Sequence, residues 1–153
     1  MRYRQSGFTV LELLVVMAII GILSAVAFIA LTKRNNQLQN LQFIEKLGQD
    51  INYARSIAMA KGQKVQIQFN SLNGYTVTNI ESSPQMTIAT ASNSQVALGN
   101  ISLGDKIVCS STGFCFGYTS ANALKTISSI TATTGTNTKT LSITLLGLTR
   151  IES

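Results

Sequence analysis

Residues 7–16 read Gly-Phe-Thr-Val-Leu-Glu-Leu-Leu-Val-Val, and they follow a short leader that holds Arg2 and Arg4. This stretch opens a run of mostly apolar residues in which Glu12 is the only acidic residue. An ionised side chain inside a membrane segment costs roughly 2.5–3.5 kcal/mol, so a glutamate there usually marks function and needs a partner. Glu12 therefore predicts a counter-charge close by.

A cut after Gly7 would supply that counter-charge, because it leaves an α-ammonium on Phe8, four residues from Glu12 on one helical face. The stretch resembles the type III signal of the type IV pilin-like family. The resemblance implies cleavage after Gly7 by a prepilin peptidase, N-methylation of Phe8 and assembly with other pilin or pseudopilin subunits. It also implies that Glu12 pairs with the N-terminal ammonium of a neighbouring subunit.

Two other interpretations of the N-terminus stay open. A conventional secretory signal also has a basic start, an apolar core and a small-x-small cleavage site. The chain offers such a site at Ala25-Val26-Ala27, but Glu12 interrupts the apolar region and the apolar run continues to Leu31. A plain structural membrane anchor is the other alternative. A mature chain that starts at Phe8 favours the pilin-like interpretation, and a start near Phe28 defeats it.

The apolar run from Val10 to Leu31 is long enough for one membrane crossing, since 22 residues of helix span roughly 33 Å and the hydrocarbon core is about 30 Å thick. Basic residues flank both ends, so orientation rests on the resemblance, which implies an inner-membrane single pass and a periplasmic C-terminal domain. We expect a leader at 1–7, a transmembrane and assembly helix at 8–34 and a globular domain at 35–153.

The pattern after Lys33 predicts that the same helix continues with one buried face. Apolar residues recur at steps of three and four, at Leu38, Leu41, Ile44, Leu47, Ile51, Ala54 and Ala58. Lys61-Gly62 is typical of a helix end. We therefore predict an amphipathic helix over 35–61 and a β domain over 63–153.

Beyond Gly62 the period of the apolar residues changes to two, which predicts a hairpin over residues 65–79. Thr131–Thr140 is rich in threonine and suggests an exposed loop or hairpin tip. Glu81–Gln95, which contains Pro84, is predicted to be a long loop with at most a short strand at Met86–Thr90. Further strands are predicted at Ser102–Val108, Gly113–Tyr118, Lys125–Thr131, Lys139–Leu146 and Leu148–Ile151. The expected fold class is α+β, with a long N-terminal α-helix packed on a C-terminal antiparallel β domain, as in type IV pilins.

Composition argues against catalysis and metal binding. The chain has no histidine and only six acidic residues, and no nucleophile–base pair is evident in the sequence. Cys109 and Cys115 are the only cysteines, and a short polar turn with a glycine separates them. In an oxidising periplasm this spacing favours a disulfide. We expect no enzymatic activity, no cofactor and no metal.

The helix end, with Ala54-Arg55-Ser56 and then Lys61-Gly62 before a strand, resembles the H-type pseudopilin and FimT-like minor pilin branch. Some members of that branch take up DNA through a Gly-Arg-x-Arg segment. Residues 147–150 read Gly-Leu-Thr-Arg and match the glycine and the second arginine. DNA binding through Lys139 and Arg150, or an adhesive role, is thus the alternative to a structural pilin or pseudopilin subunit. An ordinary terminal strand with a solvated arginine explains the same residues.

Overall fold

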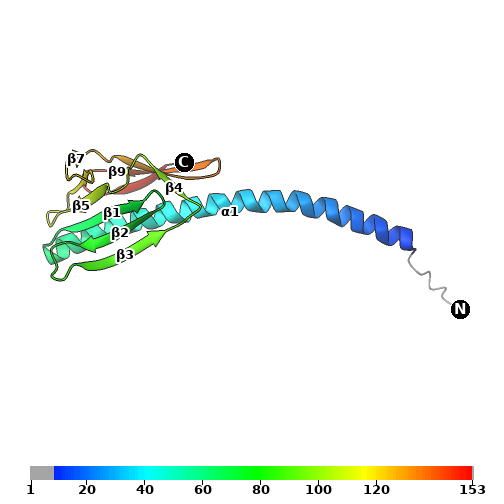
Figure 1. Ribbon diagram of the computed structural model, residues 1–153, viewed down its shortest axis with the longest axis horizontal. Coiled ribbons are helices and arrows are strands. Elements are labelled where there is room, and N and C mark those ends of the chain that lie inside the picture. The colour runs from blue at the N-terminus through cyan, green and yellow to red at the C-terminus, as the bar shows by residue number, and fades with distance from the viewer. Residues whose placement is uncertain (1–8, 153) are drawn as a thin grey trace. The chain divides into compact units, whose positions relative to one another are not determined.

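The computed structural model describes the backbone of residues 9–152, and their side chains except at 26–30, 32, 33 and 36. Over these residues the chain forms the helix α1 (Val10–Lys61), followed by strands β1 to β10 (Figure 1). It divides into two units, residues 1–35 and 36–153, and α1 contributes to both.

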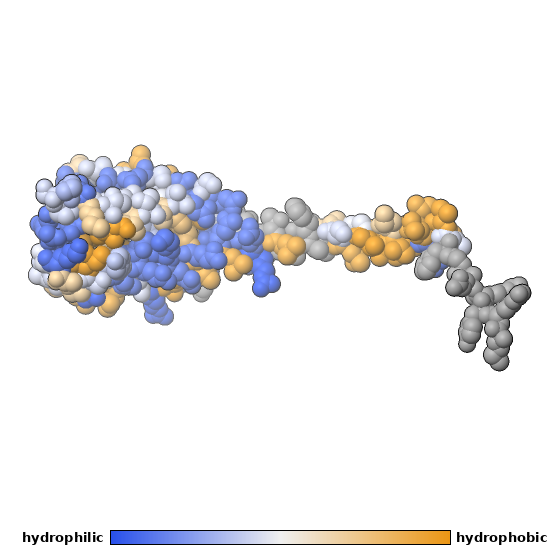
Figure 2. Space-filling view, turned by 90° about the horizontal axis from the view of Figure 1, so that it is seen from below, coloured by the Kyte–Doolittle hydropathy of each residue, from blue (hydrophilic) through white to orange (hydrophobic). Residues whose placement is uncertain are grey.

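The first unit consists, in its described part, of the beginning of α1. Its side chains from Val10 to Ala25 are all exposed, and most of them are apolar (Figure 2). Among the side chains that the structure describes, no helical stretch combines the length and apolarity that a membrane crossing requires.

In the second unit, α1 supplies the predicted buried stripe. Ile44, Leu47, Ile51, Ala54 and Ala58 have no exposed surface, whereas Leu38, at the start of the stripe, is 45% exposed. The helix ends at Lys61 as predicted, and Gly62 follows with a φ of +65°. Glycine is the residue that adopts this left-handed conformation without steric cost, so the chain can leave the helix there.

The second unit contains two antiparallel sheets. The larger has the order β3-β2-β1-β5-β6-β7 and the smaller has the order β10-β9-β8-β4. The strands of the larger sheet are β1 (Val65–Ser71), β2 (Gly74–Asn79), β3 (Met86–Ser92), β5 (Lys106–Cys109), β6 (Cys115–Tyr118) and β7 (Leu124–Lys125). Those of the smaller sheet are β4 (Ala97–Gly99), β8 (Ser129–Thr134), β9 (Asn137–Ile143) and β10 (Thr149–Glu152).

Both sheets share one core with the second half of α1. Phe69 and Tyr75 of the larger sheet, and Ile130 and Leu141 of the smaller one, are fully or almost fully buried in it. The expected α+β class, with the helix packed on antiparallel sheets, is confirmed.

Buried polar side chains attach α1 to each sheet. The Tyr75 hydroxyl donates to Asp50 Oδ2 at 2.8 Å, and Lys46 forms an ion pair with the same carboxylate at 3.3 Å. Burial, together with the hydrogen bond to Asp50 and its charge, raises the pKa of Tyr75 well above its usual value. On the other sheet, Asn40 Nδ2 donates to the Asn137 carbonyl at 2.6 Å, and Thr134 Oγ1 donates to Asn40 Oδ1 at 2.5 Å.

The predicted hairpin over 65–79 is confirmed as β1 and β2, but several other strand predictions are corrected. The predicted strand Ser102–Val108 begins only at Lys106, because the Ser102 N–H donates to the Asp105 carboxylate at 2.8 Å and closes a turn. The predicted strand Lys125–Thr131 is divided between β7 and β8. The strand predicted over Lys139–Leu146 ends at Ile143.

Thr131–Thr140 does form a hairpin with an exposed tip, as predicted, but the tip is limited to two residues and the rest is strand. Most of it belongs to β8 and β9, and only Gly135 and Thr136 lie between these two strands. Threonine is β-branched and fits a pleated surface, and Ala132 and Thr134 alternate into the buried side of the sheet. The abundance of threonine therefore indicated strands more than a loop.

Candidate functional site

The predicted processing residues, Gly7 and Phe8, lie outside the described residues, so cleavage and methylation stay predictions. The predicted assembly residue, Glu12, lies in the first turn of α1 with an exposed side chain. Its backbone N–H donates to Thr9 Oγ1 at 3.3 Å.

Thr9 is a residue that the sequence reasoning missed. A Thr-x-x-Glu spacing at a helix start is a capping box, in which the threonine hydroxyl accepts from the backbone N–H three residues on. The hydrogen bond from Glu12 to Thr9 forms one half of this arrangement. A carboxylate in the first turn also interacts favourably with the helix dipole. Glu12 thus has a local structural role beside the predicted role in docking.

Cys109 and Cys115 form the predicted disulfide. They are opposite one another at the ends of β5 and β6, and both are buried. The turn between them is closed by a hydrogen bond from the Ser110 N–H to the Phe114 carbonyl at 2.8 Å. The bridge therefore fixes the end of a hairpin in the larger sheet.

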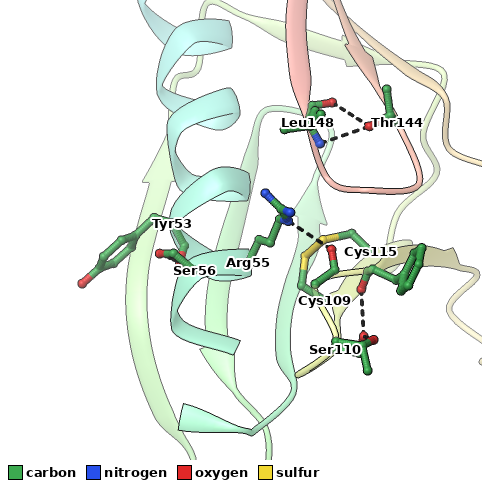
Figure 3. The surroundings of a disulfide bond; sticks show 11 residues. Tyr53, Arg55, Ser56, Cys109, Ser110, Cys115, Thr144 and Leu148 are labelled. Atoms are coloured by element: carbon green, nitrogen blue, oxygen red, sulfur yellow. Dashed lines mark hydrogen bonds between the residues drawn. A yellow bond between two sulfur atoms is a disulfide. The ribbon is translucent and has the colours of Figure 1, made fainter. Parts of the chain in front are cut away.

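Three segments meet around this disulfide (Figure 3). From α1, Arg55 Nε donates to the Gly113 carbonyl in the turn between the cysteines, at 3.1 Å. From β6, the Cys115 N–H donates to the Leu145 carbonyl at 3.0 Å, which links the larger sheet to the turn between β9 and β10. That turn is closed by a hydrogen bond from the Thr144 N–H to the Leu148 carbonyl at 3.0 Å.

Gly147 lies in that same turn and has a φ of +67°. A Cβ atom placed on it would lie 2.6 Å from Cys115 Sγ and 3.1 Å from Arg55 Cδ. Both the backbone conformation and the lack of space require glycine here. The glycine of the Gly-Leu-Thr-Arg segment therefore has a structural explanation that does not involve DNA.

Lys139 and Arg150, the predicted DNA-binding residues, lie on opposite faces of the smaller sheet. Lys139 is opposite the buried Ala132, so it is on the face that packs towards α1. Arg150 is opposite Ser142, on the other face, because side chains alternate along a strand. The structure does not bring the two cations together on one surface.

An exposed apolar cluster near the disulfide was not predicted either. The rings of Phe114 and Phe116 stack with centroids 6.3 Å apart, and both are more than a third exposed. Phe116, Leu124 and Leu145 also line a cavity of about 320 Å³. Its other lining residues include Lys125, which forms an ion pair with the buried Asp105. Among the residues described, no metal-ligating side chains gather in a group of three or more.

Comparison with known proteins gives a match to a family profile at the N-terminus and a likeness of fold to solved structures. Residues 2–28 match the profile of the family described as the prokaryotic N-terminal methylation motif. No curated protein matches the sequence. The fold is similar to two crystal structures of the type IV minor pilin FimU of Pseudomonas aeruginosa strain PAO1, in space groups P65 and P21.

The P65 structure gives a TM-score of 0.52 at 13% identity, over 74% of this chain and 92% of the other. The P21 structure gives 0.54 at 14% identity, over 80% of this chain and 92% of the other. At these identities the likeness is one of fold alone.

Proposed function

We propose that this chain, whose N-terminal methylation motif and fold support the type IV pilin-like family, is a minor pilin or pseudopilin. It is a structural subunit of a type IV pilus or of a type II secretion pseudopilus. A prepilin peptidase cuts it after Gly7, and Phe8 is methylated. Before assembly the subunit crosses the inner membrane once through residues 8–34 and holds residues 35–153 in the periplasm.

The observation that carries the proposal is an apolar helix with exposed side chains and one carboxylate in its first turn. The large apolar side chains from Val10 to Leu23 are between 46% and 79% exposed. Such a surface needs cover from lipid or from other helices, and the packed helices of a filament would provide it. Glu12 is then the one charge that such packing must pair.

The experiment must separate docking by the charge of Glu12 from capping by its side chain. Glu12→Gln keeps a residue that can cap the helix start but removes the charge. Glu12→Ala removes both, and Thr9→Ala removes the hydroxyl that accepts from Glu12. If docking depends on the charge, both Glu12 variants should be processed normally but enter filaments poorly, whereas Thr9→Ala should enter them well. Normal incorporation of Glu12→Gln would contradict the electrostatic role.

Processing is tested separately, by mass analysis of the mature N-terminus. The proposal requires a chain that begins with methylated Phe8. A chain that begins near Phe28 would instead indicate a conventional signal peptidase and would overturn the proposal. DNA binding is not part of it, since Lys139 and Arg150 lie on opposite faces of the sheet and Gly147 has a structural role. Salt-sensitive DNA retention that is lost on replacing both cations would be evidence for that alternative.

A further inference from the structure

The turn between β9 and β10, residues 144–148, is attached to the larger sheet mainly through Cys115. The Leu145 carbonyl accepts from the Cys115 N–H at 3.0 Å. A Cβ atom placed on Gly147 would lie 2.6 Å from Cys115 Sγ and 3.1 Å from Arg55 Cδ, so the turn also lies directly against the disulfide. Its three leucines add little burial, because all of them are exposed: Leu145, Leu146 and Leu148. Docking of the turn therefore depends on where Cys115 lies.

The position of Cys115 is in turn fixed by its bond to Cys109. Cys109 lies in β5, which has β1 on one side and β6 on the other, and its side chain has no exposed surface. β6 is less well supported, because its outer neighbour β7 is only two residues long. The disulfide joins the first residue of β6 to the interior strand β5 (Figure 3). The bond thus holds Cys115 Sγ in its contact with Gly147.

The structure leaves room for Cys115 to move when the bond is absent. Cys115 lines the cavity of about 320 Å³ beside the turn. An unbonded side chain can change its χ1 rotamer and occupy part of this space, away from Gly147. The turn would then lose the sulfur against which it packs. Thr149, the first residue of β10, stays attached to Asn52 of α1 at 3.0 Å, so β10 keeps its place while the turn moves.

We propose that the Cys109–Cys115 disulfide is a redox-dependent latch for this turn. Residues 144–148 are docked on the larger sheet when the cysteines are oxidised and detach when they are reduced. A dithiol opens the latch: its two electrons break the sulfur–sulfur bond, its two protons go to the two cysteine sulfurs, and it closes to its own disulfide. The opening is local, so the core and both sheets stay folded. This inference goes beyond the proposed filament role and does not depend on it.

The first test measures amide hydrogen exchange in the full chain, in a mild detergent, before and after reduction with dithiothreitol. The Cys115 N–H reports on the turn, because its acceptor is the Leu145 carbonyl. The matched control is the Phe69 N–H, which donates to the Asp105 carbonyl at 2.9 Å in the same sheet. A general loss of stability speeds up both amides, so the ratio of their rates isolates the turn. The bridge spans six positions, and its loss should raise this ratio about 30-fold. An unchanged ratio would overturn the proposal.

The second test uses the two thiols of the reduced chain as internal controls for each other. Iodoacetamide should alkylate Cys115 faster than Cys109, because the turn lifts from Cys115 whereas Cys109 stays buried opposite Val65 of β1. Global unfolding would expose both thiols together, so equal rates would refute a local latch. A chain with both Cys109→Ala and Cys115→Ala needs no reductant and should show the same amide ratio as the reduced wild type. A ratio like that of the oxidised wild type would mean that the turn docks without the bond, and would also refute the proposal.

Discussion

Replacing Gly147 by alanine should destabilise the second unit through two separable effects. The first is the left-handed backbone conformation, which costs a residue with a Cβ about 1–2 kcal/mol. The second is steric, because the new Cβ would lie 2.6 Å from Cys115 Sγ, and overpacking of this kind typically costs about 1–3 kcal/mol. Together they predict a loss of about 2–5 kcal/mol in the free energy of unfolding.

Gly62 provides a matched control for the backbone effect. Its φ of +65° is close to the +67° of Gly147, but a Cβ placed there would have no neighbour within 4 Å. Gly62→Ala should therefore cost only about 1–2 kcal/mol. The difference between the two variants measures the steric contacts with the disulfide and with Arg55.

The assay is denaturant unfolding of residues 36–153, which contain the whole buried core, under oxidising conditions. In a background where Cys109 and Cys115 are alanine, the contact with Cys115 Sγ is gone and the tighter remaining contact is the 3.1 Å approach to Arg55 Cδ. Most of the steric cost should then disappear, and the cost of Gly147→Ala should fall towards that of Gly62→Ala. Equal costs for the two glycine variants in the presence of the disulfide would refute the reasoning. The same measurement is also a necessary control for DNA-binding experiments, because a Gly147 variant that no longer binds DNA could have lost its stability instead of a DNA contact.

Three further predictions concern stability. Replacing Cys109 and Cys115 together by alanine should lower the free energy of unfolding by about 2 kcal/mol, because the bridge spans six positions; an unchanged denaturation midpoint would contradict this. Lys125→Met should cost about 1–3 kcal/mol by leaving the buried Asp105 carboxylate without its cation, and adding Asp105→Asn should recover part of the loss in a double-mutant cycle. The stability that Tyr75 contributes should fall in alkali. Its pKa is higher in the folded than in the unfolded state, so its contribution to the free energy of unfolding is complete below the unfolded pKa of 10.0 and is lost progressively as the pH rises above that value. The stability difference between wild type and Tyr75→Phe should then change by about 1.4 kcal/mol per pH unit above pH 10, and a constant difference would sink the idea.

Features set by local sequence could be predicted, and features set by distant pairing could not. The helix end at Lys61 and the hairpin over 65–79 follow from residues within a few positions of each other, and both were predicted correctly. The spacing of the cysteines likewise suggested their bridge. By contrast, the start of β5 depends on the turn closed by Asp105, whose local hydrogen bond competes with strand pairing.

The candidate DNA-binding residues show most clearly that features set by pairing of distant segments could not be predicted from the sequence. Nothing near Arg150 in the sequence says that it lies opposite Ser142, on the other face from Lys139. That relation follows from the strand register, which is set by pairing between segments and by burial of one face. The role of Gly147 depends on Cys115 in another sheet, so the sequence showed only a glycine in a short motif. The cap at Thr9 was readable from the Thr-x-x-Glu spacing and was missed.

Two of the polar attachments of α1, those of Asn40 and Asp50, have a mechanical consequence. Asn40 is tied to the smaller sheet and Asp50 to the larger one, at points about 15 Å apart along the same helix. A pull along the axis of α1 would thus be transmitted to each sheet at its own anchor point. The helix would divide the tension between the two sheets. Neither sheet alone would then bear the whole force on a subunit that is pulled by its N-terminus.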